Sequence, residues 1–369
     1  MNQYEKLKAI EAELNGQFLE RADEIHALLL CLVAKQHCLL IGPPGTAKSL
    51  LVRSLADRLG AKVFQWLLTK FSTPEEIFGP VSMPDLKAGR YKRITTDKMP
   101  EADCVFIDEI FKANSAILNS MLTILNERVY HNNGGPAKVP LQFAVGASNE
   151  FPQGEELNAL FDRFLVRMVV NYLADDASVA GLLNLDRQPG AKPTTLDAKE
   201  LEFLQAMRVG IDVPQAVRDA MVALRRALKA EGIIASDRRW RESLALVQAE
   251  ALMAGRVECK VADLEVLRHV LWSDPGHKDK AQGVVLALVN PWRKAAVEIL
   301  DEARSVWGAT DPETVTADAA TEIGLKLKGV LARAEAAAKD SGSSEFNQTV
   351  AYIKARRKDL KKAILGEEG

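Results

Sequence analysis

The chain has 369 residues, of which 47% are hydrophobic and 27% are charged, and its formal net charge is −2. This length allows two or three domains with cores of their own, and the composition is ordinary for a soluble globular protein. The near-neutral charge argues against bulk electrostatic attraction to nucleic acid or to an anionic membrane. The start of the chain lacks the basic and then apolar layout of a secretion signal, and no run of about 18 apolar residues occurs. We therefore expect a cytoplasmic protein with no membrane span.

The cysteines are scattered, mostly within apolar runs, at Cys31, Cys38, Cys104 and Cys259. None of their spacings is that of a zinc-binding pair. Reduced, buried thiols are the expected state.

Two helices, over 4–15 and 17–35, are predicted ahead of the first strand. In the second, apolar residues recur on one helical face (Ile25, Leu28, Leu29 and Leu32), and its polar positions are Arg21, Asp23 and Glu24. Both helices would cover a sheet. The segment 18–20 could in addition line an adenine pocket.

The stretch 38–49 combines a strand, a glycine- and proline-rich turn and the start of a helix. Cys38–Ile41 is apolar, as in a buried parallel strand, and leucines recur at helical spacing from about Lys48. This order is typical of a phosphate-binding loop, in which backbone N–H groups and a helix N-terminus hold phosphates. Lys48 would reach the β- and γ-phosphates, and the Ser49 hydroxyl would ligate Mg²⁺. The predicted cofactor-binding residues are Gly42, Pro43, Pro44, Gly45, Thr46, Ala47, Lys48, Ser49 and Leu50.

The pattern G-x-x-x-x-G-K-[ST] is broken once, because Ala47 stands where the second glycine belongs. Its Cβ would narrow the room for phosphate without closing it. On the motif alone, a turn that only caps a core helix remains the alternative.

Beyond the loop we expect Gly60 to end the helix, followed by a strand over 62–68 and a helical turn over 74–79 that begins at Thr73. The chain then turns polar and basic over 80–100. Such a stretch is either a solvated excursion or a loop that contacts a substrate or partner.

A second stretch with a functional signal is the apolar run Cys104–Ile107, which is followed by two carboxylates, Asp108 and Glu109. In open α/β sheets, ligands bind at the carboxyl ends of the strands. Asp108 would hold Mg²⁺, directly or through water, and Glu109 would polarise the attacking water. An acidic helix start would look the same in isolation, but the phosphate loop about sixty residues earlier favours the catalytic pair.

A helix over 115–128, a hairpin over 130–140 and an apolar strand over 141–149 are predicted next. The strand ends in Asn149, which would hydrogen-bond the attacking water or the γ-phosphate. Capping of the following helix is the alternative role for this residue.

Two arginines follow, Arg163 and Arg167, on one helical face or in the strand after it. They are either surface residues paired with Asp162 or Glu156, or one of them is presented to the γ-phosphate of a neighbouring subunit. The spacing alone leaves both possibilities open.

Taken in order, these blocks resemble an AAA+ ATPase module. Residues 42–49 resemble Walker A, 106–109 Walker B, 148–149 sensor 1 and 162–164 the arginine-finger segment. Three further stretches are similar to the MoxR family within AAA+: 73–79, 122–128 and 160–165. The block 235–240 resembles the sensor 2 segment of the RavA branch, where alanine at the position of Ala47 is also seen. The likeness covers roughly residues 4–275.

The resemblance implies ATP and Mg²⁺ as cofactors, held by Lys48, Ser49 and Asp108, with Glu109 as the base. It gives Asn149 the sensor 1 role, Arg163 the role of the finger in trans and Arg238 the role of sensor 2. Arg167 remains the rival for the finger. A hexamer, a partner with a von Willebrand factor A domain and a protein client are also implied.

The resemblance further implies that the excursion at 80–100 and the hairpin at 130–140 face the central pore of a ring. Tyr91 is the candidate for client contact. Nucleic acid is not expected as a partner.

Residues 174–200 have a linker composition, and helices are expected over 197–208, 214–230, 236–254 and 261–271. In this lid, Arg238 could reach back to the γ-phosphate or make a local salt bridge. Trp240 and Trp272 are expected in the core. Three more helices are predicted, over 281–308, 313–338 and 345–365, with apolar stripes that include Trp292 and Ile364. The basic face of the last helix, from Lys354 to Lys362, is either solvated or docks an acidic partner.

We therefore predict an α/β fold, in which a P-loop AAA+ module with a parallel sheet is followed by an all-α lid and a helical C-terminal domain. The predicted domains are 1–185, 196–275 and 276–369. The leading function is an ATP-hydrolysing, chaperone-like remodelling machine. The alternatives are a nucleotide-switched scaffold with negligible turnover and a DNA-directed AAA+ protein.

Overall fold

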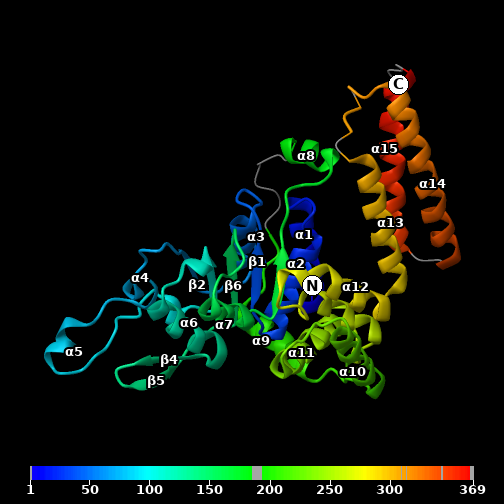
Figure 1. Cartoon of the computed structure of the whole chain (residues 1–369). Helices are drawn as coiled ribbons and strands as arrows, with labels where there is room; N and C mark the ends of the chain where they lie inside the picture. The colour runs from blue at the N-terminus through cyan, green and yellow to red at the C-terminus, as the bar shows by residue number, and fades with distance from the viewer. Residues whose placement is uncertain (1, 185–192, 309, 313, 342–343, 366–369) are drawn as a thin grey trace. The chain divides into compact units, whose positions relative to one another are not determined.

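The computed structural model describes residues 2–184, 193–308, 310–312, 314–341 and 344–365 (Figure 1). The chain divides into two compact units, Met1–Lys278 and Asp279–Gly369. Within the described ranges, no helix combines the length and the apolar character that a membrane crossing needs. All four cysteines are free and buried, as predicted.

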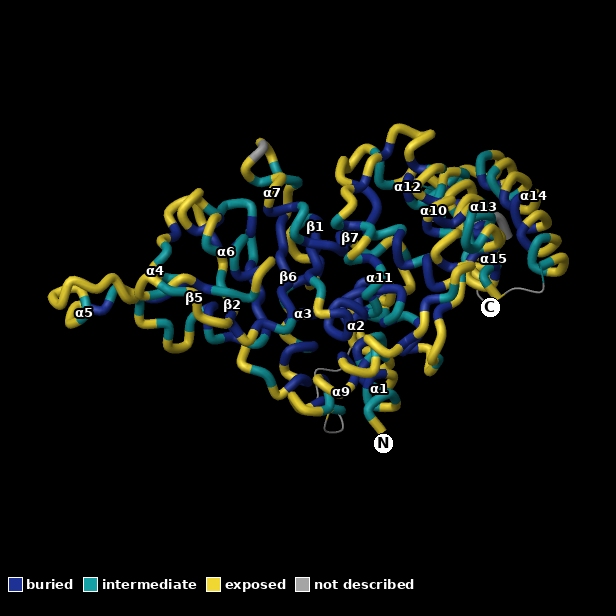
Figure 2. Tube along the Cα trace, turned by 90° about the horizontal axis from the view of Figure 1, so that it is seen from below, coloured by how far each residue is buried: buried dark blue, intermediate teal, exposed yellow. Residues whose placement is uncertain are grey.

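A five-stranded parallel sheet lies at the centre of the first unit. Its strands are β1 (Cys38–Ile41), β2 (Val63–Leu67), β3 (Cys104–Asp108), β6 (Phe143–Ser148) and β7 (Val166–Val169). Their order is β2-β3-β6-β1-β7, so β6 lies between β1 and β3. The three central strands are apolar and almost wholly buried, which is typical of a parallel sheet covered on both faces (Figure 2). The predicted α/β class is confirmed.

Helices α1 (Gln3–Gln17), α2 (Ala22–Ala34) and α3 (Lys48–Ala56) lie beside this sheet, and α2 contacts β1 and β7 directly. The predicted amphipathic character of α2 is wrong, because its residues from Glu24 onward are almost all buried. The helix also packs against α1, α9 and α11, so it has no broad solvent face. Helix α3 ends at Ala56 rather than at the predicted Gly60.

Two excursions leave the sheet region at the same end of the unit (Figure 1). The first carries α4 (Pro74–Phe78), α5 (Met83–Lys87) and η1 (Met99–Glu101), and the second is the predicted hairpin of β4 (Val129–Asn132) and β5 (Gly135–Lys138). Between the excursions, the Asn132 side chain accepts from the N–H of Arg93 (2.8 Å) and donates to its carbonyl (3.1 Å). The excursions are therefore fastened to each other at the turn end of the hairpin.

The rest of the first unit is helical. It contains η2 (Ile110–Lys112), α6 (Ser115–Glu127), α7 (Glu155–Arg163), α8 (Asp176–Leu183), α9 (Ala198–Val209), α10 (Gln215–Ala230), α11 (Asp237–Met253), η3 (Val261–His269) and η4 (Pro275–His277). The expected linker at 174–200 holds α8 and the start of α9, while its residues 185–192 lie outside the described ranges. The element expected at 261–271 is a 3₁₀ helix.

The second unit is built from α12 (Lys278–Val289), α13 (Pro291–Trp307), α14 (Ala317–Ser341), η5 (Ser344–Phe346) and α15 (Asn347–Leu365). The single helix predicted over 281–308 is broken, because Asn290 caps α13 and Pro291, which has no N–H, takes its first position. Trp307, Leu327 and Ile353 belong to the core of this unit. Trp292 is 46% exposed and does not join the predicted stripe, and the side chain of Ile364 lies outside the described part.

Gly42 lies where the phosphate loop leaves β1, and a Cβ at this position would be 1.9 Å from the carbonyl oxygen of Val170. The substitution Gly42→Ala should therefore lower the free energy of unfolding by about 2 kcal/mol or more. Thermal unfolding followed by circular dichroism measures this. Gly16→Ala is the control, since a Cβ at Gly16 in α1 meets no atom within 4 Å and should be neutral or stabilising. Equal melting temperatures for the two variants would contradict the steric account.

Glu24, in the first turn of α2, is 7% exposed, and burial raises the pKa of its carboxyl to about 7. An unfolded glutamate titrates near 4.3, so the folded protein holds a proton that the unfolded chain releases. Stability is therefore expected to fall as the pH rises from about 4.5 to about 7, and to stay lower above that. Glu24→Gln should stabilise the protein at pH 8 by up to about 3 kcal/mol more than at pH 5.

Melting temperatures at both pH values, with the exposed Glu202→Gln as the matched control, test this expectation. A Glu24→Gln effect that is the same at pH 5 and pH 8 would refute it.

Candidate active site

The loop 42–49 connects β1 to α3 and contains two residues in the left-handed region. Gly45 has φ of +79° and Ala47 has φ of +63°. A residue with a Cβ pays about 1–2 kcal/mol for this conformation, whereas glycine does not. Since the Ala47 side chain itself is exposed, the effect of the missing glycine is backbone strain.

Lys48 is buried, and its ammonium group bends back onto the loop. The Nζ atom donates to the carbonyl oxygens of Gly42 (2.6 Å) and Pro43 (2.8 Å) and lies 3.3 Å from Oδ1 of Asn149. Burial lowers the pKa of Lys48, while the nearby carboxylates of Asp108 and Glu109 act in the opposite direction. The lysine therefore connects the loop to Asn149 after β6 by a hydrogen bond, and to Asp108 and Glu109 at the end of β3 by charge.

The polar residues after β3 and β6 lie beside the start of α3. The Ser49 hydroxyl donates to Oδ2 of Asp108 (3.0 Å), and the Asn149 amide donates to the Glu109 carboxylate. Glu109 itself has φ of +52°, a strained conformation of the kind found at functional sites. Because β6 separates β1 from β3, these residues meet at one edge of the sheet.

This arrangement fits a nucleotide and a magnesium ion. The Ser49 hydroxyl and the Asp108 carboxylate are the hard oxygen ligands that Mg²⁺ prefers. The loop presents backbone N–H groups at the N-terminus of α3, where phosphate binds favourably. The side chains of Pro44 and Leu50 remain accessible, whereas Thr46 is buried and donates to the Pro43 carbonyl.

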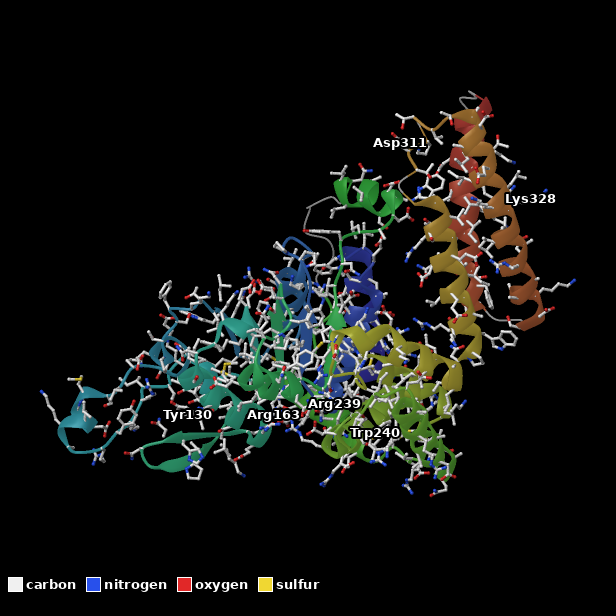
Figure 3. All side chains as sticks on the ribbon, in the orientation of Figure 1. Tyr130, Arg163, Arg239, Trp240, Asp311 and Lys328 are labelled. Carbon is white, nitrogen blue, oxygen red and sulfur yellow. The ribbon has the colours of Figure 1, made fainter. Side chains whose placement is uncertain are left out.

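Arg163 is the last residue of α7 and lies half-buried near the amino end of β7 (Figure 3). Its guanidinium makes no hydrogen bond or ion pair with any residue of the described ranges, and its Nε is buried without a partner. Burial and the positive charge of Arg238 both lower the pKa of Arg163. An arginine held this way has its donors free for an external anion.

Arg167, in β7, is only 1% exposed, and all its contacts are internal. Its guanidinium donates to the carbonyls of Phe161 and Trp272 and stacks 3.8 Å above the Phe161 ring centroid. Asp162 lies 3.6 Å away as its counter-charge. Presentation of Arg167 to a neighbouring subunit is therefore contradicted, because the side chain is a structural element of the core.

Arg239 shares the Asp162 carboxylate with Arg167. It is 1% exposed, pairs with Asp162 at 3.0 Å and donates to the carbonyls of Leu165 and Val270, both at 2.8 Å. This residue at the start of α11 therefore fastens the lid helix to the amino end of β7. The resemblance pointed to the neighbouring Arg238 instead, and no local signal in the sequence distinguishes Arg239 from it.

Arg238 precedes Arg239 in α11, and its Nε forms an ion pair with Oε1 of Glu242 at 2.9 Å. Its charge acts on His37, which directly precedes β1, and on Arg163. Lys48, in contrast, follows the carboxyl end of β1. Contrary to the prediction, Arg238 therefore lies at the opposite end of the strands from its own phosphate loop and does not reach back to it.

Phe71, in the loop after β2, is a further residue that the sequence analysis missed. It is 89% exposed, whereas the predicted contact residue Tyr91 is 57% exposed. The sequence does contain a signal for it, because Phe71 is an aromatic residue within an otherwise polar stretch, Thr69–Thr73.

Comparison with known proteins places the chain in a family. Residues 5–206 match the model described as the MoxR domain in the MoxR-vWA-beta-propeller ternary systems, and residues 216–285 match an AAA lid domain. The protein MJ0079 of Methanocaldococcus jannaschii is 39% identical over 302 residues, which are 82% of this chain and 78% of that protein. The chaperone MoxR1 of Mycobacterium tuberculosis is 26% identical over 202 residues, 54% of this chain and 53% of MoxR1.

Among solved structures, a "putative ATPase" of Cytophaga hutchinsonii aligns with a TM-score of 0.63 at 16% identity. The alignment covers 78% of this chain and 94% of that one, and it supports the fold. None of these matches names the RavA branch. The family match over residues 5–206, with the lid that follows it, shows that the chain belongs to the MoxR family of AAA+ ATPases.

Proposed function

We propose that this chain is an ATP-hydrolysing subunit of a ring, most simply a hexamer, that remodels a protein client. The observation that carries the proposal is that a set of four phosphate-side residues lies together at one end of the strands, while an arginine without a partner in the described ranges lies at the other end. Lys48, Ser49, Asp108 and Glu109 form the set, and Arg163 is the arginine.

Each residue of the set has a task that its position supports. Ser49 and Asp108 would hold Mg²⁺, which supplies charge neutralisation on the phosphate oxygens. Lys48 would exchange its loop carbonyls for phosphate oxygens. Glu109 would take the proton of the attacking water, and Asn149, which donates to that carboxylate, would orient both.

Arg163 would act on the nucleotide of the adjacent subunit. Because its guanidinium lies near the amino ends of the strands, it is far from its own phosphate loop, so only a neighbour could use it. Arg238 lies beside Arg163, and we propose that it too faces the neighbour. A positive charge delivered in this way stabilises the transition state of phosphoryl transfer.

The fastened excursions and the loop after β2 are the proposed client-contacting surface. Tyr91 and Phe71 supply exposed aromatic contacts, and Asn132 holds the two excursions together. A partner carrying a von Willebrand factor A domain is proposed because the matching family is described by its association with such domains. Membership in the RavA branch remains a proposal based on the block 235–240.

Two rival functions are less well supported. A switched scaffold with negligible turnover would need neither Glu109 in contact with Asn149 nor an Arg163 that has no ion pair within the described residues. A DNA-directed protein would be expected to carry a basic binding surface, and the net charge of −2 does not favour one.

Two inactive variants should restore each other if the finger acts between subunits. Glu109→Gln removes the base but keeps Arg163, and Arg163→Ala removes the finger but keeps the base, so each alone should lose at least about 100-fold in ATPase rate. In an equimolar mixture, some interfaces combine an intact base with an intact finger. The steady-state ATPase rate of the mixture should then exceed the sum of the separate rates, and it should rise with total protein concentration.

Arg218→Ala, at an exposed position in α10, is the matched control and should keep the wild-type rate. A mixture no more active than its parts, combined with an active Arg163→Ala variant, would contradict the role of Arg163. Tight ATP binding without turnover in the wild-type protein would favour the switched scaffold.

A further inference from the structure

Arg21 connects the start of α2 to the end of β7. It precedes the first residue of α2 and is 7% exposed. Its Nη2 donates to the carbonyl of Asn171 (2.6 Å) and its Nη1 to the carbonyl of Glu20 (2.9 Å). The Glu20 carboxylate accepts from the N–H groups of Ala174 (2.8 Å) and Asp175 (3.1 Å). The segment 20–21 is thus fixed against residues 171–175.

A short series of contacts leads from Arg21 to the phosphate loop. Asn171, which accepts from Arg21, follows Val170, and the Val170 carbonyl fills the space where Gly42 would carry a Cβ. The Gly42 carbonyl in turn accepts from Lys48 at 2.6 Å. Arg21 and Lys48 are close enough that the charge of Arg21 contributes to lowering the pKa of Lys48, although burial is the larger cause.

No carboxylate of the described ranges forms an ion pair with Arg21. Across the described ranges, its hydrogen-bond partners are two neutral backbone carbonyls. A guanidinium has five N–H donors, so three remain without a protein acceptor. Glu20 and Glu24 are the carboxyls whose charges act on Arg21. The Glu20 oxygens accept from the N–H groups of Ala174 and Asp175 rather than from the guanidinium, and burial raises the pKa of Glu24 to about 7.

Burial of a cation without a counter-ion is unfavourable. Arg167 and Arg239, which are buried more deeply, share the carboxylate of Asp162. The protein therefore supplies an anion where an arginine only holds the fold together. At Arg21, next to the loop proposed to bind phosphate, no carboxylate of the described ranges forms such a pair, and the nearby Glu20 oxygens accept from backbone N–H groups instead.

We propose that Arg21 is a nucleotide-binding residue that contacts the polyphosphate as a second cation beside Lys48. The proposal rests on the proposed function of the phosphate loop and adds to it a residue that lies outside the motif, on α2. Three donors in a planar group suit the oxygens of a phosphate better than an ammonium does. Because Arg21 connects the start of α2 to the end of β7, a contact with nucleotide would also act on the position of these two segments.

Isothermal titration with MgADP and with adenosine tests the proposal. In Arg21→Gln, the dissociation constant for MgADP should rise about 10-fold or more, as loss of a charged hydrogen bond predicts, whereas that for adenosine should change less than about 2-fold. Arg21→Lys, which keeps the charge, should lie between wild type and Arg21→Gln. Arg53→Gln is the matched control, because Arg53 lies on α3 but is exposed and bonded to Gln65, and it should bind MgADP as the wild type does.

The outcomes separate this proposal from the one on which it rests. If Lys48→Ala abolishes MgADP binding but Arg21→Gln does not weaken it, the role of Arg21 is wrong and the nucleotide site stands. If Arg21→Gln and Arg21→Lys weaken MgADP and adenosine equally and both melt earlier without ligand, Arg21 is structural and the proposal is overturned. If the wild-type protein binds no MgADP, both proposals fail.

Discussion

The register of three parallel strands is the constraint on which the candidate site depends. Because β6 lies between β1 and β3, the loop after β1, the acidic pair after β3 and Asn149 after β6 must meet at one edge of the sheet. On its other side, β1 pairs with β7. The loop starts beside the Val170 carbonyl, which occupies the space that a Cβ at position 42 would need, so this path of the backbone requires glycine. Backbone packing therefore sets the geometry of the loop independently of the side chains proposed to be catalytic.

The amino ends of the same strands carry a different chemistry. There Asp162 neutralises Arg167 and Arg239, and Arg239 ties the start of the lid helix α11 to the first residues of β7. Arg163 adjoins this cluster in sequence but takes no part in it. In the proposed function, one edge of the sheet receives an anion and the other presents a cation. Two such unlike edges are suited to head-to-tail contacts, which close into a ring when the rotation between subunits allows it.

The sequence predicted the features that local patterns encode. Apolar runs with defined ends gave the central strands, and motif spacing gave Lys48, Asp108, Glu109 and Asn149, which the parallel topology then brought together. Features that depend on distant packing were missed. Arg238 and Arg239 are adjacent and chemically alike, and it is contacts with Asp162, Leu165 and Val270, distant in the sequence, that hold Arg239 in the core. Helix α2 was predicted to have a polar face, but contacts from α9 and α11, far along the chain, cover it.

The charges that remain unpaired distinguish function from structure in this molecule. Lys48, Arg21 and Arg163 are each at least half-buried, and within the part of the chain that the structure describes none of them forms an ion pair with a carboxylate. Ala47 and Glu109 add strained backbone at the same edge as Lys48. Each of these features lowers stability, and none improves packing. Proteins retain such destabilising features where a bound ligand compensates for them. The negative charge of a polyphosphate would offset the buried cations, and its oxygens would accept hydrogen bonds from the backbone N–H groups of the strained loop.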